Sequence, residues 1–140
     1  MIMYNLFVYG SLRKGFKSPM YEYISRYFSY VGEARVKGKL LDMGDYPVAI
    51  PTNEEIYLQG ELFKINHPDE FNFAMAQLDD YEGLNPEEGE YSAYIRTVAT
   101  IEFNNQTIPA WIYWFNGDTT GRPLVASGDV LLYMLEKTQN

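Results

Sequence analysis

The pattern of apolar and polar residues along the chain predicts more strands than helices. The first apolar run, Leu6–Tyr9, does not alternate with polar residues, which is typical of a strand buried on both faces. Further along, the pattern predicts strands at Val31–Leu41, Val48–Ile50, Tyr57–Ile65, Tyr91–Phe103 and Thr107–Phe115. Asn104-Asn105 between the last two strands indicates a hairpin.

Three segments have the apolar spacing of helices. They are Pro19–Tyr27, the segment from Pro68 to Tyr81 or Glu82, and a final helix at Gly128–Lys137 that Ser127 would cap. Because strands outnumber helices and the only evident hairpin comes late, we expect an α+β fold. Its mixed sheet would curl or close, with two or three helices outside it.

Composition narrows the class of protein. The 140 residues, 46% of them hydrophobic, suffice for a single domain over residues 1–140. The net charge of -8 disfavours nucleic acid as a partner. No apolar stretch has membrane-spanning length, and the short N-terminal apolar run is unlike a signal peptide. We therefore expect a soluble cytoplasmic protein that contacts neither nucleic acid nor membrane.

The residue types present also limit the chemistry. Without cysteines, the chain has no disulfide, thiol nucleophile or thiolate metal site. The single histidine, His67, leaves little room for a Ser-His-Asp triad and rules out a His-rich metal site. Asp79, Asp80 and Glu82 are close in sequence but point in diverging helical directions, so a solvated helix end is favoured over a metal site.

Glu82 is the strongest candidate for a functional side chain. Phe71, Met75, Leu78 and Glu82 fall on one narrow stripe of the predicted helix, so a carboxylate follows the core-facing direction. Two interpretations remain open. Either the helix has ended and Glu82 is an ordinary surface acid, or it lies at a cavity wall where desolvation raises its pKa.

A second candidate is the loop that follows the first strand. Gly10 interrupts the apolar run, and a buried strand that stops at a glycine leaves backbone N–H groups free to bind a ligand oxygen. Residues 10–18 nearly match a phosphate-binding loop, but Phe16 displaces Lys17 from the required position. Arg13, Lys14 and Lys17 form a small basic cluster, and Arg96 is expected in a surface ion pair.

Several motifs follow one another along nearly the whole chain. They are Phe7-Val8-Tyr9-Gly10-Ser11-Leu12-Arg13-Lys14-Gly15, Met43 to Pro47, Gln59-Gly60-Glu61-Leu62, Leu78-Asp79-Asp80-Tyr81-Glu82-Gly83, Tyr94-Ile95-Arg96, Ala110-Trp111-Ile112-Tyr113 and Ser127-Gly128-Asp129. Together they resemble the gamma-glutamylcyclotransferase superfamily, in its smaller AIG2-like and gamma-glutamylamine cyclotransferase branch. The resemblance implies a compact, mostly closed mixed β-barrel flanked by helices, with a cavity at one end.

The resemblance also implies a reaction. The α-amino group of a small γ-glutamyl substrate attacks its own γ-amide carbon, 5-oxoproline forms, and the attached amine leaves, with no cofactor or metal. Glu82 would be the catalytic acid and base, and the substrate would be bound by Tyr9, Gly10, Ser11, Leu12, Tyr94 and Tyr113. The chain departs from the family at Phe16-Lys17-Ser18-Pro19 and in the acidic loop Leu84 to Glu90.

Two other hypotheses are carried beside the enzyme. One is a non-catalytic module that keeps the cavity for a small amino-acid-like ligand. The other is an interaction domain whose thirteen tyrosines form a partner surface. A cavity that joins the Gly10 loop to Glu82 would separate the last hypothesis from the first two.

Overall fold

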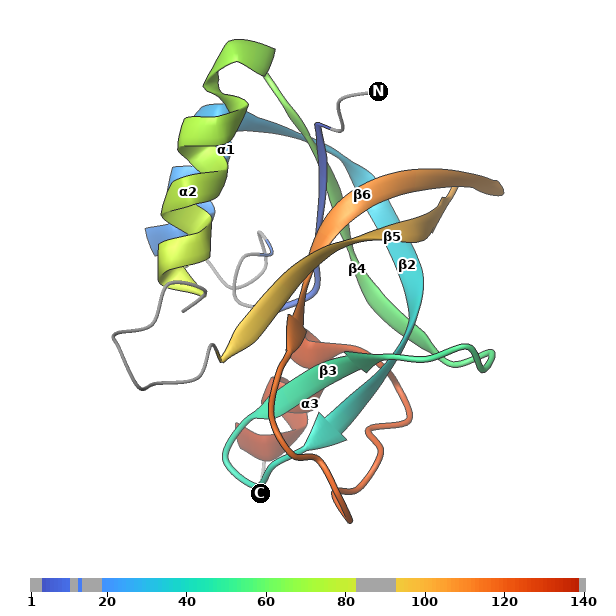
Figure 1. Ribbon diagram of the computed structural model, residues 1–140. Helices are drawn as coiled ribbons and strands as arrows, with labels where there is room; N and C mark the ends of the chain where they lie inside the picture. Colours follow the sequence, from blue (N-terminus) through green and yellow to red (C-terminus); the bar gives the residue numbers. More distant parts are fainter. Residues whose placement is uncertain (1–3, 11–12, 14–18, 83–92, 139–140) are drawn as a thin grey trace.

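The computed structural model describes residues 4–10, 13, 19–82 and 93–138 (Figure 1). The strands are β1 (Asn5–Val8), β2 (Phe28–Asp42), β3 (Pro47–Pro51), β4 (Tyr57–Ile65), β5 (Tyr94–Phe103) and β6 (Gln106–Phe115). The helices are α1 (Pro19–Tyr27), α2 (Phe71–Tyr81) and α3 (Val130–Thr138), with a short 3-10 helix, η2 (Pro68–Glu70), before α2. None of the helices in the described parts of the chain is long and apolar enough to cross a membrane.

The strands form a closed mixed barrel, which confirms the predicted fold class. Their order is β3-β2-β4-β1-β6-β5, and a further pairing between β2 and β5 closes the sheet. Neighbouring strands are antiparallel except for β1 and β6, which run parallel where Leu6 pairs with Trp111. Strand β3 extends the sheet beyond the closed part, at the edge of β2.

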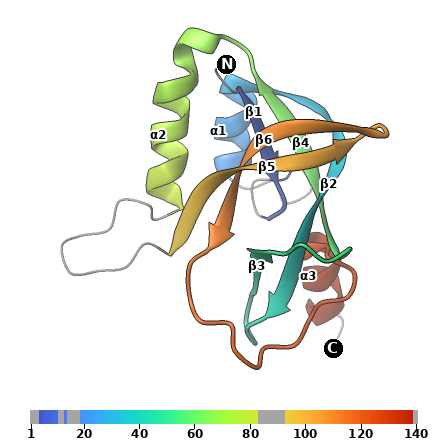
Figure 2. The same cartoon turned by 45° about the vertical axis from the view of Figure 1, so that its right-hand side comes forward.

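Strand β1 is buried on both faces, as its continuous apolar run predicts. Leu6 and Val8 belong to a core under α1 and α2, whereas Phe7 belongs to a second core on the other face of the sheet. Figure 1 shows α1 and α2 together on one side of the barrel, and Figure 2 shows α3 at the opposite end, beside β3. The end of β1 therefore lies between the two cores.

The predicted bounds are confirmed for some elements and corrected for others. Helix α1 and strand β4 have the predicted bounds. Asn104 and Asn105 have φ angles of 51° and 63°, as a tight hairpin between β5 and β6 requires. Strand β2 begins three residues earlier than predicted because Phe28 already pairs with Ile65 on β4.

The last helix begins later than predicted. Gly128 has a φ of 63°, so the helix cannot include it, and α3 starts at Val130. Asp129 is the residue that caps α3: its Oδ1 accepts the N–H of Leu132 at 3.1 Å. Ser127, the predicted cap, instead accepts the N–H of Asp129 at 3.3 Å.

Candidate active site

A cavity of about 280 Å³ lies where the end of β1 meets the end of α2. It also reaches the turn before β3, the first residue of β5, strand β6 and helix α3. Its lining residues are Phe7, Val8, Tyr9, Gly10, Tyr46, Pro47, Glu82, Tyr94, Tyr113, Val130 and Met134. The lining is mostly apolar and aromatic, and Glu82 is the one charged side chain among these described residues.

Glu82 is held at the cavity by the end of α2. It is the C-terminal cap residue of the helix, and its N–H donates to the carbonyl of Leu78 at 2.9 Å. The predicted stripe is confirmed, since Phe71, Met75 and Leu78 are all buried. Burial raises the pKa of Glu82 from 4.5 to about 7, so near neutral pH the group exists both as carboxylate and as carboxylic acid.

Three tyrosines surround this carboxyl group. The Tyr9 hydroxyl donates to the carbonyl oxygen of Tyr113, so its proton is already engaged with the protein. Burial raises the pKa of Tyr9 and Tyr113, and raises that of Tyr94 to about 12. The nearby negative charge of Glu82 adds to each of these shifts. All three hydroxyls therefore keep their protons at neutral pH.

Asp79 connects the end of α2 to strands β5 and β6. Its Oδ1 accepts from Arg96 Nε at 2.8 Å and from the Tyr113 hydroxyl at 2.7 Å, and its Oδ2 accepts from Arg96 Nη2 at 2.9 Å. The Arg96 guanidinium also lies 4.6 Å from the centre of the Trp111 ring. The expected ion pair of Arg96 exists, but it is partly buried beside the cavity rather than at the surface.

The structure brings most of the predicted site residues together. Tyr9, Gly10, Glu82, Tyr94 and Tyr113 all line the one cavity, whereas Ser11 and Leu12 lie outside the described residues. The interpretation of Asp79 as part of a solvated helix end is wrong, because its carboxylate pairs with Arg96. The only sequence signal for this role was the helical spacing, which points Asp79 away from Asp80 and from Glu82.

Other lining residues gave no sequence signal of their own. Val130 and Met134 come from α3, and their contact with the cavity depends on long-range packing. Arg13 is a further correction, because it is 7% exposed and paired with Asp129 and Glu61 instead of belonging to a surface basic cluster. Lys14 and Lys17, the other members of that predicted cluster, lie outside the described residues.

The fold and cavity define a small mixed barrel with an isolated, partly buried carboxyl group facing aromatic walls. The family model for gamma-glutamyl cyclotransferase, AIG2-like proteins matches residues 6–132. The chain therefore belongs to this family, as its motifs predicted. None of the curated proteins matches the sequence.

Solved structures support the same fold. YkqA from Bacillus subtilis is 22% identical with a TM-score of 0.71, and the match covers 99% of this chain but only 44% of that protein. An uncharacterized protein from Pyrococcus horikoshii is 20% identical with a TM-score of 0.67 and is covered over 98% of both chains. An AIG2-like protein from Mus musculus is 18% identical with a TM-score of 0.61, over 89% of this chain and 86% of that one.

Proposed function

We propose that the protein cyclises a γ-glutamyl amide to 5-oxoproline and a free amine, with Glu82 as acid and base. The observation that carries this proposal is the position of Glu82. Its carboxyl group has a pKa of about 7 and shares a 280 Å³ cavity with Gly10. Membership of the gamma-glutamyl cyclotransferase, AIG2-like family supports the same class of reaction.

The reaction requires two protons to move, one after the other, from the α-nitrogen to the leaving nitrogen. The substrate's α-ammonium group gives a proton to the Glu82 carboxylate, and the freed amine attacks the γ-amide carbon. A new C–N bond closes the five-membered ring, and Glu82 gives its proton to the leaving nitrogen. Glu82 then takes the second proton from the ring nitrogen, the bond to the leaving amine breaks, and the amine departs as an ammonium ion with that second proton. A group that titrates near the working pH suits both steps, because neither protonation state is strongly favoured. Attack within one molecule also needs no second reactant to be positioned.

The remaining site residues would bind the substrate. Backbone groups at Gly10, with Ser11 and Leu12, would hold the glutamyl carboxylate, since N–H groups beyond the end of a strand have no partner in the sheet. The Tyr94 and Tyr113 rings would wall the reacting centre, and Asp79 would fix the Tyr113 hydroxyl. Tyr9 would contribute its ring, because its hydroxyl already donates to the Tyr113 carbonyl.

The test is to incubate the purified protein with a panel of γ-glutamyl amines and γ-glutamyl dipeptides and to measure 5-oxoproline. N-acetylated versions of the same substrates are the matched controls, because a blocked α-amino group cannot attack. Release from the free substrates alone would support the proposal. Binding of these compounds without release would favour the non-catalytic binding module.

Glu82→Gln makes the test specific to the proposed residue. Glutamine keeps the shape and hydrogen-bonding capacity of the side chain but cannot accept the ammonium proton at neutral pH. We expect a loss of about 10²–10⁴-fold in turnover. Glu55→Gln is the control, because it removes an exposed carboxylate that does not line the cavity. Full activity in Glu82→Gln would remove the mechanism.

A further inference from the structure

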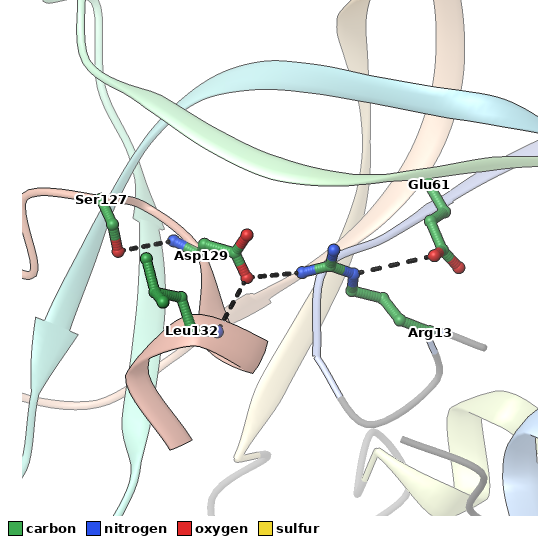
Figure 3. A network of polar contacts seen from close by, with 5 residues as sticks. All are labelled: Arg13, Glu61, Ser127, Asp129 and Leu132. Carbon is green, nitrogen blue, oxygen red and sulfur yellow. Dashed lines mark hydrogen bonds and ion pairs between the residues drawn. The ribbon is translucent and has the colours of Figure 1, made fainter. Parts of the chain in front are cut away.

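A buried arginine lies next to the proposed site without lining its cavity (Figure 3). Arg13 is 7% exposed, and its Nη1 lies 2.9 Å from Oδ1 of Asp129. Its Nε lies 3.9 Å from Oε2 of Glu61, which is itself 3% exposed. Figure 3 shows the guanidinium between these two carboxylates, one from β4 and the other from the start of α3.

Arg13 is connected to both sides of the cavity. On one side, its backbone N–H donates to the carbonyl of Gly10 at 3.0 Å, and Gly10 lines the cavity. On the other side, the Asp129 oxygen that binds Arg13 also caps α3 by accepting the N–H of Leu132. Helix α3 supplies Val130 and Met134 to the cavity wall.

Strand β4 contacts both of the segments that Arg13 connects, the end of β1 and the start of α3. Glu61 lies in β4, directly opposite Val8 of β1. The N–H of Gln59, two residues earlier, donates to the carbonyl of Gly128 at 2.8 Å. A Cβ at Gly128 would lie 1.9 Å from the carbonyl oxygen of Tyr57, so only glycine permits this close approach of the α3 entry to β4.

The cluster of Arg13, Glu61 and Asp129 is poorly explained as a means of stabilising the fold. Burying a guanidinium and a carboxylate costs free energy that their attraction offsets only when the geometry is good. Here the Arg13 Nε is buried and has no hydrogen-bond partner among the described residues. Buried ionic groups of this kind can instead specify one arrangement of the elements they connect.

We propose that Arg13 is a positioning residue of the site: through Asp129 and Glu61 it fixes the α3 wall of the cavity relative to Gly10. The inference rests on the proposed function and deepens it. Because Arg13 lies outside the cavity lining, it takes no part in the proton transfer. It controls how closely the cavity fits the γ-glutamyl substrate.

The kinetic experiment compares Arg13→Lys and Asp129→Asn with the wild type. Lysine keeps the charge but not the forked donor geometry, and asparagine can still cap Leu132 while losing its charge. We expect KM to rise by about tenfold while kcat changes by less than about threefold, as removal of binding common to ground and transition states requires. The acidic inflection of the pH profile, set by Glu82, stays in place.

Arg35→Lys is the matched control. Arg35 and Glu102 also form an arginine–carboxylate pair, with Nη2 and Oε1 3.0 Å apart, but the pair is much more exposed. We expect its KM to equal that of the wild type. A drop in melting temperature in the Arg13 and Asp129 variants with an unchanged KM would overturn the proposal, and so would a fall in kcat alone.

A measurement without substrate separates this proposal from the proposed function. In ¹³C-methyl NMR spectra, Arg13→Lys and Asp129→Asn should shift the resonances of Val130 and Met134. The methyl of Met75, in the separate core under α2, should not move. If the wild type releases no 5-oxoproline from any substrate, the proposed function fails, while these shifts still decide the role of Arg13. Unmoved Val130 and Met134 resonances would refute it.

Discussion

The Tyr113 hydroxyl donates to the Asp79 carboxylate at 2.7 Å, and Asp79 stands just under one helical turn before Glu82. The same carboxylate accepts two hydrogen bonds from Arg96. Strands β5 and β6 are thus joined to the end of α2 at the point where the helix presents its acid. A helix end is ordinarily prone to fraying, and these bonds restrict it.

We expect Asp79→Asn to lower the free energy of unfolding by about 1–3 kcal/mol, because Arg96 would keep its partly buried charge without a carboxylate partner. Turnover should fall as well, since the positions of Tyr113 and Glu82 depend on this anchor. Urea unfolding and 5-oxoproline release measure the two effects. Asp80→Asn, an exposed neighbour on the same helix, should change stability much less.

Glu82 should make the wild type less stable as pH rises. Its pKa is raised in the folded state, so between pH 4.5 and about 7 the native protein holds a proton that the unfolded chain has lost. The stabilisation that this proton gives is fully present below the pKa that Glu82 has in the unfolded chain. It is lost as the pH rises through the pKa that Glu82 has in the folded protein. At about pH 8, the free energy of unfolding of Glu82→Gln should exceed that of the wild type by up to about 3 kcal/mol. This is the free-energy equivalent of the difference between the folded and unfolded pKa values of Glu82.

Thermal or urea unfolding of the two proteins across this pH range checks the sign. At about pH 4, where the wild-type carboxyl group is protonated in both states, their stabilities should nearly coincide. A wild type that becomes more stable than Glu82→Gln at high pH would mean that the carboxylate has a stabilising partner. Glu82 would then be mainly a structural residue.

The pH dependence of the reaction should follow the same group. We expect kcat/KM to rise with pH through an inflection near 7, because only ionised Glu82 can accept the ammonium proton. Initial rates of 5-oxoproline release over a series of buffers give the profile. An inflection close to 4.5, the ordinary value for a glutamate, would contradict the burial of this carboxyl group in the working enzyme.

The walls of the cavity indicate which amines should leave most readily. Pro47, Val130 and Met134 offer apolar contacts, and Glu82 supplies negative charge. A second carboxylate on the amine half would be repelled, and like charges brought together in a closed site cost several kcal/mol. We therefore expect γ-glutamyl-isopentylamide to exceed γ-glutamyl-leucine in kcat/KM by at least about tenfold, or about 1.4 kcal/mol.

These two substrates differ only in the α-carboxylate of the leaving group, so their ratio isolates that charge. Met134→Lys should narrow the ratio by offering a cation to the carboxylate. Equal use of the two substrates by the wild type would show that the amine half does not contact this wall. A preference for γ-glutamyl-leucine would require a cationic group at the cavity rim.

The sequence was most informative where local patterns control the structure. Pro19 and the apolar spacing after it define α1, and Asn104-Asn105 provides the two positive φ angles of the hairpin. The stripe on α2 led to Glu82 for the same reason, since helical spacing is a local property. The parallel alignment of β1 with β6 has no comparable local signal.

Residues that depend on distant partners could not be predicted in this way. The sequence predicts that Arg13 belongs to a basic surface cluster, because its partners, Glu61 and Asp129, are far away in sequence. Val130 and Met134 look like ordinary helical core positions until α3 is placed beside the end of β1. A burial pattern shows that a side chain faces inward but does not show which cavity it faces.

The pairing of Leu6 with Trp111 also constrains how the molecule is assembled in time. Strand β1 is synthesised before every other strand that the structure describes, yet one of its two neighbours, β6, is synthesised after all of them. Contacts between such distant parts of a chain form slowly, because a long loop must close before they are gained. Tyr9 meets Tyr113 only at that moment. A nascent chain that still lacks β6 therefore offers no pocket for a ligand, and a small molecule can assist folding only after β6 has been synthesised.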